Sequence, residues 1–238
     1  MGNVDRPIGI IGAMEVEIEL LVAKMGEHGK VKKRNYAGTT FNCGTIEGVD
    51  VVVVRSGVGM VNAALCVQIL VSDFHASCII NTGVAGSLDS AIDIGDVVVA
   101  SDAVNHIMDV SNLGYQPGQN PDYVFVGFPA SKELAEKALS AAGELGVKAH
   151  KGRVASGDVF VHTQEQKDYI RSQFKASCCE MEGAAIAQAC YVNRIPYLIL
   201  RAISDKADGS STMDYPTFEA LAARTCAGLT VRLLGMLP

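Results

Sequence analysis

The sequence contains no tryptophan, and its seven Phe and seven Tyr bring the aromatic share to only 6% of 238 residues. Charged residues are also sparse at 19%, the formal net charge is −6, and the densest cationic run is the short segment 30–34. A polyphosphate site, a nucleic-acid footprint or an anionic membrane would each favour a basic face. We interpret this run as a solvated turn and expect a small neutral or zwitterionic ligand.

The seven cysteines lack Cys-x-x-Cys spacing, and their odd number and mostly apolar neighbours are typical of reduced, buried thiols. The five histidines show no ligand spacing, so we expect neither a metal ion nor another cofactor. No run approaches the roughly 20 apolar residues that span a bilayer, and the apolar stretch 8–14 is too short for a signal peptide. The sequence therefore indicates a cytoplasmic protein.

Strand-like and helix-like segments alternate along the chain. The expected strands are 7–13, 36–45, 50–56, 77–82, 96–103, 148–157, 177–181 and 196–203, and the expected helices are 14–24, 60–73, 131–145, 164–173, 183–193 and 216–237. The alternation predicts an α/β fold with helices on both faces of one sheet, and the length allows a single domain, 1–238. The stretch 104–130 lacks periodicity, which is typical of a lid or an interface.

Several predicted strands end in residues that a packed core does not need. The segments concerned are GAMEVE at 12–17, NTGVAG at 81–86, EME at 180–182 and RAISD at 201–205. Because ligand sites in α/β proteins form at the carboxyl ends of strands, these segments are candidate parts of a site. Each also has a simpler reading. These readings are a charge–dipole contact for Glu15 or Glu17, a tight turn at 81–86, and an ion pair between Arg201 and a glutamate.

Residues 57–62, GVGMVN, follow a strand and open a helix, as a dinucleotide-binding fingerprint does. The third glycine of that fingerprint is replaced by Asn62. No acidic residue stands at the end of a second strand at the expected distance, so we do not expect a Rossmann site.

Six segments together resemble the 5′-methylthioadenosine/S-adenosylhomocysteine nucleosidases. They are IGIIGAMEVE, SGVGMVNAA, NTGVAG, SGDVF, EMEGAAIA and RAISDKAD, which come in the order of that family and extend from residue 8 to about 208. The resemblance implies a nucleoside-phosphorylase-like, three-layer αβα fold around a mixed sheet, and a homodimer. It also implies hydrolysis of methylthioadenosine, S-adenosylhomocysteine and 5′-deoxyadenosine to adenine and the corresponding ribose, in methionine salvage.

The same resemblance implies roles for the acidic residues. Glu17 would be the general base that activates water, and Asp205 the acid that protonates N7 of the departing adenine. Arg201 and Ser204 would orient these acids. Since an adenine anion is a poor leaving group, Asp205 would have to be protonated at neutral pH, which a desolvated pocket favours. One acid at the leaving group and one base at the water parallels inverting glycosidases.

Further positions are implied to bind the substrate. Glu182 would hold the ribose hydroxyls, with Met181 packed under the sugar. Phe160 would stack on adenine, the backbone of Val161 would read its edge, and Gly86 would let the backbone approach the ligand.

The resemblance also places part of the site in a second subunit. Leu113 and Pro121 match the positions with which the partner subunit closes over the 5′-thio pocket. Two departures concern the same region: Val84 stands where many members carry Ser to place the water, and the usual acidic residue after His106 is missing. We therefore expect the water network and the 5′ pocket to differ from the family pattern.

Three alternative functions remain open. A purine or uridine nucleoside phosphorylase would need cationic anchors for phosphate, whereas the first glycine-containing turn presents Glu17. An aminodeoxyfutalosine nucleosidase would differ only beyond the 5′ carbon, which residues alone do not exclude. A non-catalytic nucleoside sensor would need neither Glu17 nor Asp205.

Overall fold

The computed structural model describes residues 6–27, 29–205 and 215–237. Its strands are β1 (Ile8–Gly12), β2 (Lys32–Tyr36), β3 (Thr39–Ile46), β4 (Val49–Arg55), β5 (Cys78–Ser87), β6 (Val97–Asn105), β7 (Phe128–Pro129), β8 (Ala149–Ser156), β9 (Cys178–Glu180) and β10 (Tyr197–Asp205). Its helices are α1 (Glu15–Glu27), α2 (Met60–Ser72), α3 (Lys132–Glu144), α4 (Gln164–Phe174), α5 (Gly183–Asn193) and α6 (Tyr215–Leu234), with one 3₁₀ turn, η1 (Ser111–Leu113). Residues 206–208 of the RAISDKAD segment lie outside the described residues. No helix in the described ranges has the length and apolar character needed to cross a membrane.

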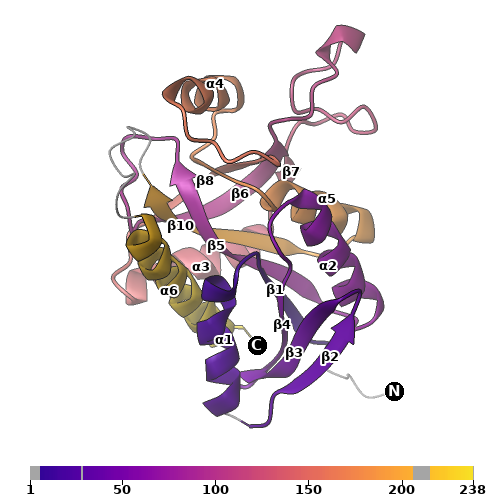
Figure 1. Ribbon diagram of the computed structural model, residues 1–238, viewed down its shortest axis with the longest axis vertical. Coiled ribbons are helices and arrows are strands. Elements are labelled where there is room, and N and C mark those ends of the chain that lie inside the picture. Colours follow the sequence, from indigo (N-terminus) through magenta and orange to yellow (C-terminus); the bar gives the residue numbers. More distant parts are fainter. Residues whose placement is uncertain (1–5, 28, 206–214, 238) are drawn as a thin grey trace.

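One mixed sheet joins the strands in the order β10-β6-β8-β9-β5-β1-β4-β3-β2, and β7 pairs with β6. Because β10 also pairs with β5, the strands β5, β9, β8, β6 and β10 close into a ring (Figure 1). β1 lies parallel to both β4 and β5, and β5 lies parallel to β10. The carboxyl ends of β1, β5 and β10 therefore meet at one edge of the sheet.

The central strands are apolar on both sides because helices cover both faces of the sheet. In β1, Ile8 and Ile10 belong to one buried cluster and Ile11 to another. Residues of α1, α3 and α6 complete the first cluster, and residues of α2 and α5 complete the second (Figure 1). The predicted three-layer αβα arrangement is confirmed.

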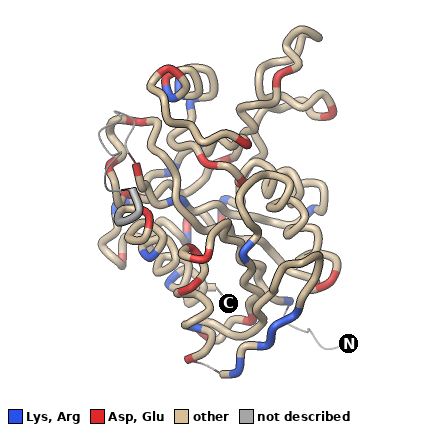
Figure 2. Tube along the Cα trace, in the orientation of Figure 1, with Lys and Arg blue, Asp and Glu red and all other residues tan. Residues whose placement is uncertain are grey.

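The basic run 30–34, which we expected to be a solvated turn, mostly forms the edge strand β2, paired antiparallel with β3. The turn comes later, at Ala37 and Gly38, which have φ angles of 48° and 76°. The side chains of this run are largely exposed, and Figure 2 shows them as a basic strip along β2. Exposed lysines on an edge strand hinder pairing with other chains, which explains why a strand can have this composition.

Two strands are longer than the sequence predicts. β5 continues through 81–86, where a tight turn was one reading, because Gly83 pairs with Arg201 of β10 and Gly86 pairs with Cys179 of β9. β10 likewise continues to Asp205 instead of ending at 203. Both extensions keep the polar ends of these strands within the sheet.

The stretch 104–130 contains the end of β6, the turn η1 and the short strand β7. Between Asn105 and Phe128 the chain leaves the sheet and projects from it at the top of Figure 1. We refer to residues 106–127 as the arm.

Candidate functional site

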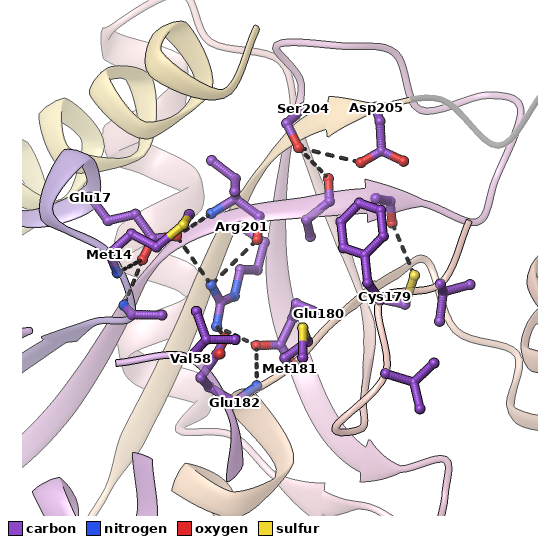
Figure 3. A pocket seen from close by; sticks show the side chains of 17 residues that line it. Met14, Glu17, Val58, Cys179, Glu180, Met181, Glu182, Arg201, Ser204 and Asp205 are labelled. Atoms are coloured by element: carbon purple, nitrogen blue, oxygen red, sulfur yellow. Dashed lines mark hydrogen bonds and ion pairs between the residues drawn. The ribbon is translucent and has the colours of Figure 1, made fainter. Parts of the chain in front are cut away.

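A pocket of about 190 Å³ lies where the carboxyl ends of β1, β5 and β10 meet (Figure 3). The end of β9 and the segment 159–161 complete its wall. Its lining residues are Ala13, Met14, Glu17, Val58, Val84, Ala85, Gly86, Val159, Phe160, Val161, Cys179, Glu180, Met181, Glu182, Arg201, Ser204 and Asp205. The four polar segments that end predicted strands thus contribute to one cavity.

Glu17 is fixed in the first turn of α1 by three backbone N–H groups. Its Oε2 accepts hydrogen bonds from Ala13 N at 2.6 Å and Met14 N at 3.0 Å, and its Oε1 accepts one from Val84 N at 3.0 Å. Burial raises the pKa of this carboxyl, while the positive charge of Arg201 and the three N–H donors act in the opposite direction. This geometry is compatible with the simpler interpretation, a contact between the Glu17 carboxylate and the helix dipole of α1. Glu17 also lines the pocket.

Gly83 allows β5 to approach Glu17 and Arg201. A Cβ at this position would overlap both Oε1 of Glu17 and Nη1 of Arg201. Gly86 has the same relation to the other end of the pocket, because its Cβ would lie 2.9 Å from Oδ2 of Asp205. The two glycines of NTGVAG are therefore required by close approach of side chains within an extended strand.

The fully buried guanidinium of Arg201 is surrounded by three carboxylates. It forms an ion pair with Glu180, and its nitrogens lie 3.4 Å from Glu182 Oε2 and 3.8 Å from Glu17 Oε1. Asn81 Oδ1 accepts a further hydrogen bond from Nη2 at 2.6 Å. With the guanidinium and all three carboxylates ionised, one positive charge faces three negative charges, so two negative charges are uncompensated. The expected ion pair between Arg201 and a glutamate exists, and it is part of the pocket wall.

Glu182 has a pKa raised to about 7, first by burial and then by the neighbouring charge of Glu180, with Arg201 acting in the opposite direction. Its Oε1 accepts a hydrogen bond of 2.9 Å from Gly59 N, at the start of α2. Asp158 Oδ1 accepts another from Met60 N at 2.8 Å. Carboxylates thus occupy the N–H groups that a dinucleotide phosphate would need, in agreement with our rejection of the GVGMVN segment as such a site.

Glu180 is a site residue to which sequence reasoning gave no role. Its carboxylate accepts hydrogen bonds from Ser156 Oγ, from the backbone N of Glu182 and Gly183, and from Arg201. It therefore joins β8, β9, β10 and the start of α5. The EME motif marked the segment, but nothing in the motif indicates that both of its glutamates line the pocket.

Asp205 lies at the opposite end of the pocket from Glu17 (Figure 3). Ser204 Oγ lies 3.4 Å from its Oδ1 and 3.5 Å from the carbonyl oxygen of Ala85, and the orienting role of Ser204 stays a prediction. The surroundings of Asp205 differ from the dry pocket that we expected, because the side chain is 17% exposed and Lys167 Nζ lies 3.3 Å from Oδ2. Lys167 is on α4, whose polar sequence gave no indication of a buried charge.

The proposed adenine and sugar contacts also lie at the pocket. Phe160 is 59% exposed at the rim, whereas Val161 and Val84 are buried. Leu113 and Pro121 lie on the arm, exposed and outside the pocket of their own chain. Their assignment to the pocket of a partner subunit stays a prediction.

No group of three or more His, Cys, Asp or Glu side chains within residues 6–27, 29–205 and 215–237 has the arrangement of metal ligands. The seven cysteines all lie in these ranges and are unpaired with one another.

Comparison with known proteins gives consistent matches over nearly the whole chain. The model of the phosphorylase superfamily matches residues 7–235. The 5′-methylthioadenosine/S-adenosylhomocysteine nucleosidase of Shewanella denitrificans is 38% identical over 232 residues, which are 95% of this chain and 98% of the relative.

Two solved structures are similarly close. The nucleosidase of the same name from Neisseria meningitidis, in complex with methylthio-immucillin-A, has 36% identity and a TM-score of 0.92, with 98% of this chain and 100% of that chain covered. The futalosine hydrolase of Helicobacter pylori has 32% identity and a TM-score of 0.93, with coverages of 99% and 100%.

The close contact at Gly83 generates a stability prediction. Gly83→Ala should lower the free energy of unfolding by about 1–3 kcal/mol, because the added methyl group displaces the side chain of Glu17 or Arg201, which both pack closely against β5. Chemical denaturation measures the difference. Gly228→Ala, inside α6 with open space around its Cβ, is the matched control and should leave stability unchanged or raise it. Equal behaviour of the two variants would contradict the close approach.

A second prediction concerns Glu182. A carboxyl whose folded-state pKa lies near 7, above its ordinary 4.5, makes the folded state lose stability as the pH rises from about 4.5 to 7. Glu182→Gln removes this loss of stability. The melting temperature of the variant minus that of the wild type should therefore be higher at pH 8 than at pH 5. The exposed Glu19→Gln variant controls for the loss of one negative charge. A pH-independent difference would show that burial does not perturb Glu182 in this way.

Proposed function

Since the chain belongs to the phosphorylase superfamily and, within it, to the family of 5′-methylthioadenosine/S-adenosylhomocysteine nucleosidases, we propose that it hydrolyses the N-glycosidic bond of 5′-thio-substituted adenosines. The products would be adenine and the 5-thio-substituted ribose from methylthioadenosine and S-adenosylhomocysteine, and adenine and 5-deoxyribose from 5′-deoxyadenosine. The family and the nucleoside-phosphorylase-like fold that the six segments implied are confirmed. The pathway that we propose is methionine salvage.

The observation that carries the hydrolytic mechanism is the position of Glu17. A buried carboxylate with a raised pKa, held by three N–H donors and facing a pocket, suits a general base that takes a proton from water. The water oxygen then bonds to C1′ of the ribose as the bond between C1′ and N9 breaks. The excess of negative charge at Glu17, Glu180 and Glu182 favours the positive charge that develops on the sugar.

The leaving group departs at the other end of the pocket. Asp205 donates a proton to N7, so that adenine leaves as a neutral base and not as an anion. Phe160 provides a face for stacking, and the backbone of Val161 contacts the edge of the base. Glu182 accepts hydrogen bonds from the ribose hydroxyls, above Met181. These roles rest on the family resemblance and on the presence of all five residues in one pocket.

The charge of the pocket favours hydrolysis over phosphorolysis. Arg201 is the single Lys or Arg among the described residues that line the cavity, and three carboxylates already surround it. A phosphate dianion placed beside Glu17 would be repelled. A phosphorylase would need an uncompensated cation at this place.

A futalosine-type nucleoside is the second candidate substrate, and the similarity to the futalosine hydrolase of Helicobacter pylori favours it. Its base and ribose would meet the same residues, so the distinction depends on the 5′ side. We propose that this side is closed by Leu113 and Pro121 of a partner subunit in a homodimer. Two exposed sites support this arrangement: the apolar residues of the arm and Phe160 at the rim.

The remaining organisation follows from the fold. We propose that the whole chain is one nucleosidase domain, because a single sheet joins all ten strands. A cytoplasmic location is supported by the seven cysteines, which are all free although several are buried.

The activity is tested by measuring adenine release from methylthioadenosine in phosphate-free buffer and again with phosphate added. We expect equal rates and free methylthioribose as the sugar product. Adenine release from aminodeoxyfutalosine, measured in parallel, compares the second candidate substrate with methylthioadenosine. Dependence of the rate on phosphate, with a sugar 1-phosphate formed, would overturn the hydrolytic mechanism.

The role of Glu17 is tested by Glu17→Gln. Loss of the base should lower kcat by about 10²–10⁴-fold, while calorimetric titration should still show methylthioadenosine binding. Glu19→Gln is the matched control, since it removes a carboxylate from the exposed face of the same helix. Undiminished turnover by Glu17→Gln would exclude Glu17 as the base.

A further inference from the structure

Lys167 is a buried cation that the mechanism above does not use. It lies on the first turn of α4, and its side chain is only 5% exposed. Burying an ammonium group is costly unless an opposite charge accompanies it. Its Nζ lies 3.3 Å from Oδ2 of Asp205, the residue that we propose as the acid.

The two groups have different access to the ligand. Asp205 lines the pocket, whereas Lys167 does not, and the contact between Nζ and Oδ2 connects the lysine to the pocket. Ser204 Oγ lies 3.4 Å from the other carboxylate oxygen, Oδ1, and Asp205 pairs with Gly86, which leaves room for the carboxylate because it has no Cβ.

Cys179 of β9 is a titratable group close to this pair. Its pKa is raised to about 12, first by burial and then by the negative charge of Asp205, with Lys167 acting in the opposite direction. The thiol is therefore neutral at physiological pH. Among the described residues, α4 supplies the positive charge that faces Asp205, and β5 supplies only the backbone of Gly86.

We propose that Lys167 is a positioning residue that stabilises the carboxylate of Asp205 as it forms during cleavage. This inference rests on the proposed function. The proton passes from Asp205 to N7, the bond between C1′ and N9 breaks with its electron pair going to adenine, and water supplies the hydroxyl at C1′. Lys167 stays an ammonium throughout and neither gains nor loses a proton.

The physical reason is that the charge next to Lys167 changes during the reaction. In the proposed reaction Asp205 gives up a proton, so the side chain next to Lys167 gains one unit of negative charge, and a fixed cation interacts more strongly with the transition state than with the ground state. In a largely buried place this difference is screened less than at the surface. The same cation also holds the carboxylate in one orientation, so the carboxylate does not have to reorient when adenine binds.

The first test compares Lys167→Met with Lys167→Arg. Lys167→Met should lower kcat at the optimum by about tenfold or more, with the KM for methylthioadenosine changed much less. Lys167→Arg keeps the charge, so it should restore most of kcat. Wild-type kcat in Lys167→Met would overturn the proposal.

The second test uses a 5-methylthioriboside with p-nitrophenolate as leaving group, which departs without needing a proton. Lys167→Met should release p-nitrophenol at a rate close to wild type, whereas Glu17→Gln should be impaired with both substrates. Equal impairment of Lys167→Met with both substrates would assign the lysine a purely structural role. Thermal unfolding of each variant checks that it is folded.

A double-mutant cycle completes the design. If Lys167 acts through Asp205, adding Lys167→Met to Asp205→Asn should cause no further loss of adenine release. Additive losses would contradict the proposal. Failure of the wild-type protein to release adenine would instead overturn the proposed function, so the two failures are distinguishable.

Discussion

The buried guanidinium of Arg201 is the group on which the rest of the site depends. A cation with 1% of its surface exposed is tolerable only with charged partners, and here Glu17, Glu180 and Glu182 provide them from the start of α1 and the end of β9. Because Arg201 belongs to β10, these contacts draw three separate parts of the fold to one point. The pairing of β10 with β5 closes the ring of strands at the same place, and Gly83 leaves the space that this closure needs.

The excess of carboxylates over cations also determines what the pocket can bind. With all four groups ionised, the cluster attracts developing positive charge and repels phosphate, which connects the electrostatics of the fold with hydrolysis rather than phosphorolysis. The raised pKa of Glu182, about 7, shows that the cluster holds negative charge at an energetic cost. A pocket selected for stability alone would replace one of these acids by a neutral side chain.

Much of this organisation could be predicted from the sequence, because it depends on residues that are close together along the chain. Strands such as β1 are apolar on both faces, and Glu17, Glu182, Arg201 and Asp205 stand near strand ends or in a first helical turn, where the pattern marks their segments as candidates. Their individual roles were implied only by the family resemblance. What could not be predicted depends on contacts between distant segments. β5 extends through Gly83 because β9 and β10 bond to it, and Lys167 looks like a surface residue of a polar helix until the fold brings its Nζ within 3.3 Å of Asp205.

The two ends of the pocket differ in a way that fits two different tasks. At one end, both carboxylate oxygens of Glu17, the proposed general base, accept hydrogen bonds and only 1% of the residue is exposed, so the carboxylate is held in one position. At the other end, the side chain of Asp205, the proposed acid, is 17% exposed, and Phe160 at the rim is 59% exposed. In the proposed reaction adenine enters and leaves at this end, so the protein cannot enclose Asp205 as tightly as it encloses Glu17. The proposed role of Lys167 answers this constraint, because its ammonium contacts the carboxylate without lining the pocket.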